Sequence, residues 1–166
     1  MSRPTPEPVQ VVKERRDAAL AALTSVSPYV RWMGVRFERH GNEIATVLPY
    51  RDELIGNPML PALHGGAPGA FLEITAQMEL MWSTVWDDIE AGTPVDDITE
   101  LAWPKVIDIT VDYLRTGLPR DAYARAVIVR AGRRYASVQV SAWQDDIAKP
   151  HAAATVHFLM PSANAT

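Results

Sequence analysis

The sequence contains no cysteine among its 166 residues, which excludes disulfide bonds and thiolate chemistry. It lacks an apolar run long enough to span a membrane, and its opening segment, MSRPTPEPVQ, lacks the apolar core of a signal peptide. The formal net charge of −4 creates no basic field that would attract nucleic acid. These absences predict a cytoplasmic protein that binds neither nucleic acid nor membranes.

A metal site is not expected either. The histidines, which are His40, His64, His151 and His157, are not paired with acidic residues at metal-ligand spacing. The chain length suits one domain with a sizeable core. Residues 1–8 are rich in proline and are expected to be disordered, and residues 9–166 are expected to form a single domain that begins with a helix.

Hydrophobic periodicity and turn residues predict the order of the elements. We expect helices at 9–23 and from the turn at 64–66 to about 85. Strands are expected at 35–38, 43–48, 107–113, 122–130, 134–143 and 151–160. The remaining segments are one broken by Pro28 and Gly34 at 25–34, a loop at 49–62 and an irregular acidic stretch at 87–104. This order fits an α+β fold in which a long antiparallel sheet wraps around one buried helix.

The central stretch Leu63–Trp82, LHGGAPGAFLEITAQMELMW, carries the most informative pattern. Its apolar residues recur at the spacing of one helix face. Glu73 falls away from this stripe, on a second face with Gly66, Gln77 and Thr84. The pattern predicts a buried helix with a single carboxylate near its middle.

The turn before this helix predicts an anion site. Gly65 and Gly66 let another group approach the backbone closely, and Pro68 fits in the first helical turn. The first N–H groups of a helix have no intrahelical partner and can stabilise a developing negative charge. Together with a carboxylate about two turns later, such a site favours acyl transfer.

Four motifs carry a resemblance to a known family over roughly residues 30–160. They are Leu63-His64-Gly65-Gly66, Leu72-Glu73, Ile109–Arg115 and Gly132-Arg133-Arg134, and Glu73 follows His64 by nine residues. The chain resembles the hotdog acyl-CoA thioesterases of the PaaI and 4-hydroxybenzoyl-CoA thioesterase group. The resemblance implies the hotdog fold and hydrolysis of an acyl- or aryl-coenzyme A thioester.

The resemblance also implies roles for individual residues. The Gly65 N–H would polarise the thioester carbonyl, and Glu73 would act as nucleophile or general base, two routes that the sequence does not separate. His64 would order the turn. Asn57, seven residues before His64, is the candidate for an amide that orients water or the carbonyl, and Gln77 occupies a position where part of the family has a hydroxyl.

The resemblance further implies how coenzyme A and a second subunit are used. Arg115, Arg133 and Arg134 are candidates to bind the phosphates of coenzyme A, since the guanidinium fork donates two hydrogen bonds at once. No separate cofactor is expected, because coenzyme A is part of the substrate. A homodimer or tetramer would bring the acid of one subunit near the HGG turn of another.

Three other interpretations stay open. One is a non-catalytic hotdog protein that binds acyl-CoA or a fatty ligand, since a fold does not fix a function. Another is a hotdog dehydratase or hydratase, for which no matching segment is found. The third is a purely structural hotdog subunit, which would not need the acid. The acyl group is undetermined, although large side chains that could line an aryl or medium-chain pocket are present, namely Phe71, Met78, Met81, Trp82, Trp86 and Trp103.

Overall fold

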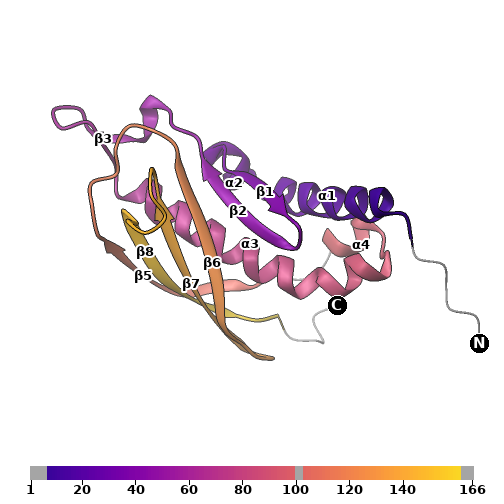
Figure 1. Ribbon diagram of the computed structural model, residues 1–166. Helices are drawn as coiled ribbons and strands as arrows, with labels where there is room; N and C mark the ends of the chain where they lie inside the picture. Colours follow the sequence, from indigo (N-terminus) through magenta and orange to yellow (C-terminus); the bar gives the residue numbers. More distant parts are fainter. Residues whose placement is uncertain (1–6, 100–102, 162–166) are drawn as a thin grey trace, which may run out of the picture.

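The computed structural model describes residues 7–99 and 103–161 (Figure 1). Of the stretch 1–8 that was predicted to be disordered, residues 1–6 lie outside the described residues, whereas Glu7 forms an ion pair with Arg15 at 2.7 Å. The helices are α1 (Val9–Val26), α2 (Pro28–Met33), α3 (Gly66–Ala91) and α4 (Val95–Thr99). The strands are β1 (Arg36–His40), β2 (Glu43–Leu48), β3 (Ile55–Asn57), β4 (Ala62–Leu63), β5 (Lys105–Tyr113), β6 (Ala122–Ala131), β7 (Tyr135–Trp143) and β8 (Ala152–Leu159). No helix in these described ranges is both long and apolar enough to cross a lipid bilayer.

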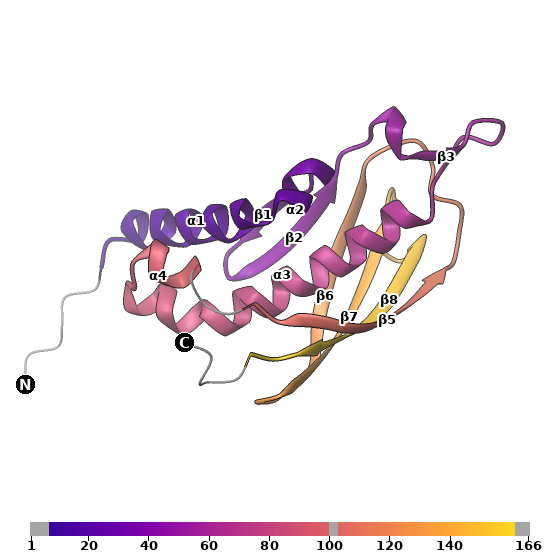
Figure 2. The same cartoon turned by 180° about the vertical axis from the view of Figure 1, so that it is seen from behind.

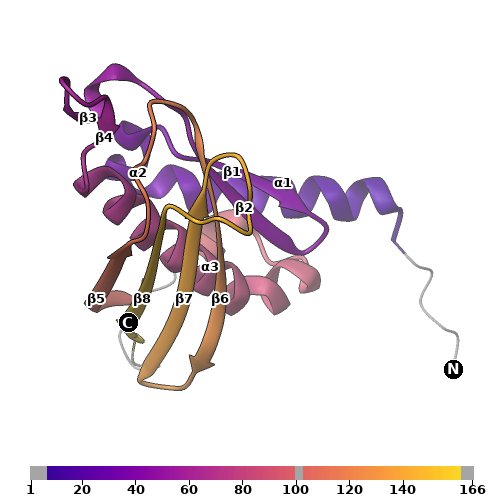
Figure 3. The same cartoon turned by 60° about the vertical axis from the view of Figure 1, so that its left-hand side comes forward.

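Six strands form one antiparallel sheet in the order β1-β2-β6-β7-β8-β5, which curves around α3 (Figures 1 and 3). The short strands β3 and β4 pair separately just before α3. This arrangement confirms the predicted α+β class with a central helix. Strand β5 lies at one edge of the sheet, and within the described part of the chain its outer side pairs with no other strand.

The hydrophobic core has two parts, one on each half of α3. The first lies between the sheet and the N-terminal half of α3, where Phe71, Leu72 and Phe158 are fully buried. The second lies between the C-terminal half of α3 and the helices α1 and α4, which lie beside it in Figure 2. Burial of apolar surface on both sides therefore fixes α3 in place.

Three predictions of irregular structure were wrong. The expected loop at 49–62 contains a 3-10 helix at Asp52–Leu54, strand β3 and the start of β4, and Gly56 lies inside β3 without interrupting it.

The segment 25–34 was also expected to be irregular. Residues 25–34 contain helix α2, in which Ser27 accepts a hydrogen bond from the Val30 N–H at 3.3 Å and Pro28 takes the first helical position. Gly34, with φ of 71°, ends that helix. Pro28 and Gly34 therefore mark the two ends of a helix and do not prevent one.

The stretch 87–104 is also more ordered than predicted. Helix α3 continues to Ala91, because Ile89 is fully buried in the second core, and it ends where Gly92 adopts φ of 79°. The short helix α4 follows and buries Ile98. The acidic residues that suggested a loop lie on the exposed side of these helices, whereas residues 100–102 lie outside the described residues.

A carboxylate that the sequence did not single out lies where two strands separate. Strands β2 and β6 pair through Thr46, Val47 and Leu48, and then diverge towards the start of β2. Glu79 lines the hollow between them, which also contains Glu43 and has a volume of about 360 Å³. Burial, together with the charge of Glu43, raises the pKa of Glu79 from 4.5 to about 6.

We expect Glu79→Gln to stabilise the protein at neutral pH. The folded-state pKa lies above the unfolded value, so folding opposes ionisation of Glu79, and stability rises as the pH falls from about 6 towards 4.5. At pH 7 the substitution should raise the free energy of unfolding by up to about 2 kcal/mol. Urea denaturation across this pH range measures the effect, and the exposed Glu53→Gln is the control. If Glu79→Gln and Glu53→Gln changed the free energy of unfolding equally across this pH range, the raised pKa of Glu79 would be contradicted.

Candidate active site

The chain reaches the start of α3 through a tightly held turn. The His64 N–H donates to the Leu54 carbonyl at 2.8 Å, and the Leu63 N–H donates to the Gly117 carbonyl at 2.8 Å. Gly56 on β3 lies so close that a Cβ there would be 2.7 Å from the His64 Cα. Only glycine fits this approach, so Gly56 allows the hairpin of β3 and β4 to hold His64 in position.

His64 orders the first turn of α3 through its own side chain. Its Nδ1 accepts a hydrogen bond from the Gly66 N–H at 3.0 Å, and its carbonyl accepts one from the Ala67 N–H at 2.9 Å. The neutral imidazole therefore carries its proton on Nε2. Within the described residues, the N–H of Gly65 has no hydrogen-bond partner, so it is available to an acceptor from outside the helix.

Tyr113, at the end of β5, adds a contact that the sequence analysis missed. Its hydroxyl donates to the Gly65 carbonyl at 2.7 Å. A Cβ added to Gly65 would lie 3.3 Å from the Tyr113 ring, so the two residues are closely packed. Tyr113 thus fixes the carbonyl of Gly65, whose N–H is free, although Tyr113 and Gly65 are 48 positions apart in the sequence. No local signal could have revealed this pairing.

Glu73 lies on α3 and is half-buried. Burial raises the pKa of its carboxyl above 4.5, and among the described residues no side chain forms an ion pair or hydrogen bond with it. The carboxylate borders a pocket of about 880 Å³, a size suited to a small organic ligand. An unpartnered carboxylate at the wall of such a pocket is a candidate base or nucleophile.

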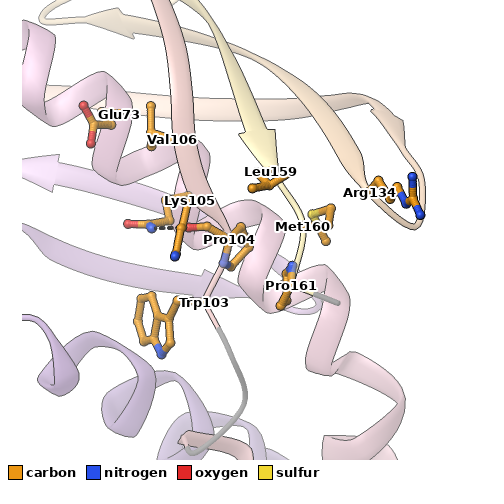
Figure 4. A pocket seen from close by; sticks show the side chains of 10 residues that line it. Glu73, Trp103, Pro104, Lys105, Val106, Arg134, Leu159, Met160 and Pro161 are labelled. Carbon is orange, nitrogen blue, oxygen red and sulfur yellow. Dashed lines mark hydrogen bonds between the residues drawn. The ribbon is translucent and has the colours of Figure 1, made fainter. Parts of the chain in front are cut away.

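The pocket lies between α3, the start of β5 and the end of β8 (Figure 4). Its lining is mostly apolar and consists of Trp103, Pro104, Val106, Leu159, Met160 and Pro161, with Glu73, Gln77, Lys105 and Arg134 as polar members. The Gln77 Nε2 donates to the Pro104 carbonyl at 3.0 Å and so ties the beginning of β5 to α3. Lys105 was not considered in the sequence analysis.

The structure therefore brings together only some of the predicted site residues. Glu73, Gln77 and Arg134 share the pocket. Gly65 and His64 lie at the start of the same helix, and at a rise of 1.5 Å per residue Gly65 is about 12 Å from Glu73 along the helix axis. One chain thus does not place the free N–H and the carboxylate at the same point.

The remaining three candidates lie away from the pocket. Asn57 uses its side-chain oxygen to accept the N–H groups of Met59 and Leu60 at 3.0 and 3.3 Å, which closes an exposed turn. Arg115 donates to the Pro150 carbonyl at 2.7 Å. Arg133 is exposed in the turn between β6 and β7. Phosphate binding by Arg115 and Arg133 stays a prediction.

The large side chains proposed for an acyl pocket mostly serve the core. Phe71, Met78, Met81 and Trp82 are at most 2% exposed, and Trp86 packs against the second core. Trp103 alone among the six lines the pocket with Glu73. Helical spacing could not separate these roles, because it predicts which residues face inward without distinguishing a cavity wall from a filled core.

A curved antiparallel sheet wrapped around one long central helix is the architecture of the hotdog-fold thioesterases. The chain belongs to the family described as the acyl-CoA thioesterase N-terminal domain, which it matches over residues 56–159. It is therefore an enzyme that hydrolyses acyl-CoA thioesters. This membership favours the enzyme over the non-catalytic binding protein considered from the sequence.

Individual relatives agree with this family. The chain is 29% identical over 116 residues to the medium/long-chain acyl-CoA thioesterase YigI of Escherichia coli K12, which covers 68% of this chain and 73% of YigI. A crystal structure from Chromobacterium violaceum is 35% identical, with a TM-score of 0.62, and covers 94% of this chain and 100% of its own. A crystal structure from Shewanella oneidensis, described as related to the thioesterase superfamily, is 18% identical with a TM-score of 0.70, and the match covers 96% of this chain and 100% of that one. This likeness supports the fold.

Proposed function

We propose that this enzyme hydrolyses medium- or long-chain acyl-CoA, with Glu73 as the catalytic carboxylate and the Gly65 N–H as the donor to the thioester carbonyl. The observation that carries the proposal is the half-buried, unpaired Glu73 at the wall of an apolar pocket. The described specificity of the relative YigI supports the choice of acyl chain. The lining of the pocket supports it too, because its apolar side chains suit an alkyl chain better than a charged group.

Two chemical routes fit Glu73. As a nucleophile, its carboxylate would attack the carbonyl and expel the thiolate of coenzyme A, and water would then hydrolyse the mixed anhydride. As a general base, it would take a proton from water while the water oxygen attacks the carbonyl, and the tetrahedral intermediate would then expel the thiolate of coenzyme A, which receives the proton from Glu73. In both routes negative charge develops on the carbonyl oxygen, where the Gly65 N–H and the positive end of α3 would stabilise it.

The separation of Gly65 and Glu73 supports a site shared between two copies of the chain. About 12 Å along the helix exceeds the reach of a glutamate side chain, so the carboxylate would serve a carbonyl bound at the helix start of a second subunit. The unpaired edge of β5 supports such an assembly. Ile107, Tyr113 and Leu114 at this edge are 56%, 58% and 51% exposed, and a long exposed edge strand favours pairing with another chain.

Release of free thiol from acyl-CoA esters tests the proposed activity directly. Purified protein should hydrolyse medium- or long-chain esters faster than acetyl-CoA, because a longer alkyl group buries more apolar surface in the pocket and so binds more favourably. Faster hydrolysis of the acetyl ester than of every longer one would contradict the proposed substrate class.

Arg134→Ala is expected to raise KM for CoA esters several-fold while turnover changes little. Arg134 is exposed at the rim of the pocket, so it can contact phosphates far from the bond that breaks. Contacts of this kind are equal in the ground and transition states. Steady-state kinetics with an acyl-CoA and with a short thioester lacking coenzyme A measure the effect. Arg36→Ala, on the opposite edge strand β1, is the control, and an equal loss with both substrates would exclude phosphate binding.

A further inference from the structure

The wall of the pocket spreads from Glu73 in two directions of different character. In Figure 4, Trp103 and Arg134 lie far from Glu73 and far from each other. The side towards Trp103 passes Gln77 and Lys105 and ends in the apolar Pro104 and Trp103, whereas the side towards Arg134 passes Leu159 and Met160 and ends in a cation. A thioester has the same division, because an alkyl chain leaves the carbonyl on one side and the phosphorylated coenzyme leaves on the other.

Trp103 is held firmly at its end of the pocket. It is half-buried and packs against the second core, so its indole lies between that core and the pocket. The next residue, Pro104, is buried, and its carbonyl is fixed to α3 by the hydrogen bond from Gln77. A rigid proline and a tether to the central helix leave the indole little freedom to move aside for a ligand.

Trp103 also lies further along α3 than the carboxylate. Gln77, which tethers the adjoining residue, is one helical turn beyond Glu73, which corresponds to about 6 Å along the axis. An alkyl chain that starts at a carbonyl near Glu73 and runs past Gln77, whose amide is already bonded to Pro104, and past Lys105 would therefore meet the indole after a limited number of methylene groups. Other described apolar side chains at this wall are smaller or lie towards Arg134.

We infer that Trp103 sets the maximum length of the acyl chain that this thioesterase accepts, with an unbranched alkyl chain ending against its indole. The inference rests on the proposed function for the position of the carbonyl. It makes Trp103 a specificity residue that contacts the end of the substrate away from the bond that breaks. Shortening the side chain should therefore change which chain is preferred without removing catalysis.

The test compares Trp103→Ala and Trp103→Leu with the unmodified protein on CoA esters from butyryl to stearoyl. The preferred chain should lengthen in both variants, more so in the alanine variant. Each methylene that enters the vacated apolar space should raise kcat/KM about fourfold. Trp86→Ala is the matched control, because Trp86 packs against the same core without lining this pocket. An unchanged chain-length profile in both Trp103 variants would overturn the inference.

Binding measurements separate this inference from the proposed activity. Acyl-CoA thioethers of the same chain lengths cannot be hydrolysed, so calorimetry reports how the pocket accommodates each chain without any turnover. A shift of preferred length in Trp103→Leu would support the inference even for a protein that hydrolyses no ester. If Trp103→Leu and the unmodified protein bound every thioether with the same affinity, the inference would be overturned, even if the unmodified protein hydrolyses acyl-CoA esters rapidly.

Discussion

Replacing Glu73 with Gln is expected to lower turnover of acyl-CoA by roughly two or more orders of magnitude, the contribution typical of a general acid or base. Glutamine keeps the shape of the side chain and removes its charge, so it can neither attack a carbonyl nor accept a proton. Affinity for the substrate should change little, because the apolar wall of the pocket is retained. Single-turnover and steady-state kinetics measure the two effects separately.

The pH dependence of the unmodified enzyme gives a second measure of the same carboxylate. Burial raises the pKa of Glu73, and the ionised form is the active one, so kcat should fall as the pH decreases through that raised value. Glu79→Gln is the control, since Glu79 is on the same helix but lines a different hollow. A Glu73→Gln enzyme as fast as the Glu79→Gln enzyme would remove Glu73 from the mechanism.

Gly65→Pro is expected to lower turnover by about two to three orders of magnitude, the loss typical when one oxyanion donor is removed. Gly65 has φ of −54°, which a proline ring can adopt, so the substitution deletes the N–H with little change in that angle. Gly65→Ala is the matched control, because it introduces the same close Cβ contact with Tyr113 and keeps the N–H. Equal losses in the two variants would attribute the effect to crowding.

Mixing the two inactive variants tests the shared site. When subunits of Glu73→Gln and Gly65→Pro exchange at random, half of the dimers are mixed, and each mixed dimer has one site with both an intact carboxylate and an intact N–H. About a quarter of the original activity should then return. No recovery after verified subunit exchange would show that each chain uses its own Gly65 and Glu73.

The start of α3 could be predicted from the sequence, because the signals that determine it are local. Two glycines and a proline in the first turn are sufficient to identify the beginning of a helix. The end of α3 could not be predicted from the same kind of evidence. Asp87 and Asp88 suggested a loop, whereas burial of Ile89 against α1 and α4 extends the helix to Gly92.

The candidate site was predictable where its residues lie on one helix and unpredictable where distant segments meet. Glu73 and Gln77 follow from helical spacing. The bonds of Tyr113 to Gly65 and of Gln77 to Pro104 join residues 48 and 27 positions apart, and no periodicity encodes them. The three arginines were equivalent in sequence terms, and only the structure shows that Arg134 lines the pocket, whereas the adjacent Arg133 and the distant Arg115 do not.

The divergence of β2 from β6 gives the molecule two regions of unequal stability. The hairpin of β1 and β2 joins the remaining sheet through three residue pairs, whereas β6, β7, β8 and β5 are paired along most of their length. Amide hydrogens of the hairpin should therefore exchange with solvent through a local opening that leaves the other strands folded. Such an opening would hydrate Glu79 and leave the pocket beside Glu73 unchanged, because that pocket is lined by residues of α3, β5, β8 and the turn before β7 and by none of β1 or β2.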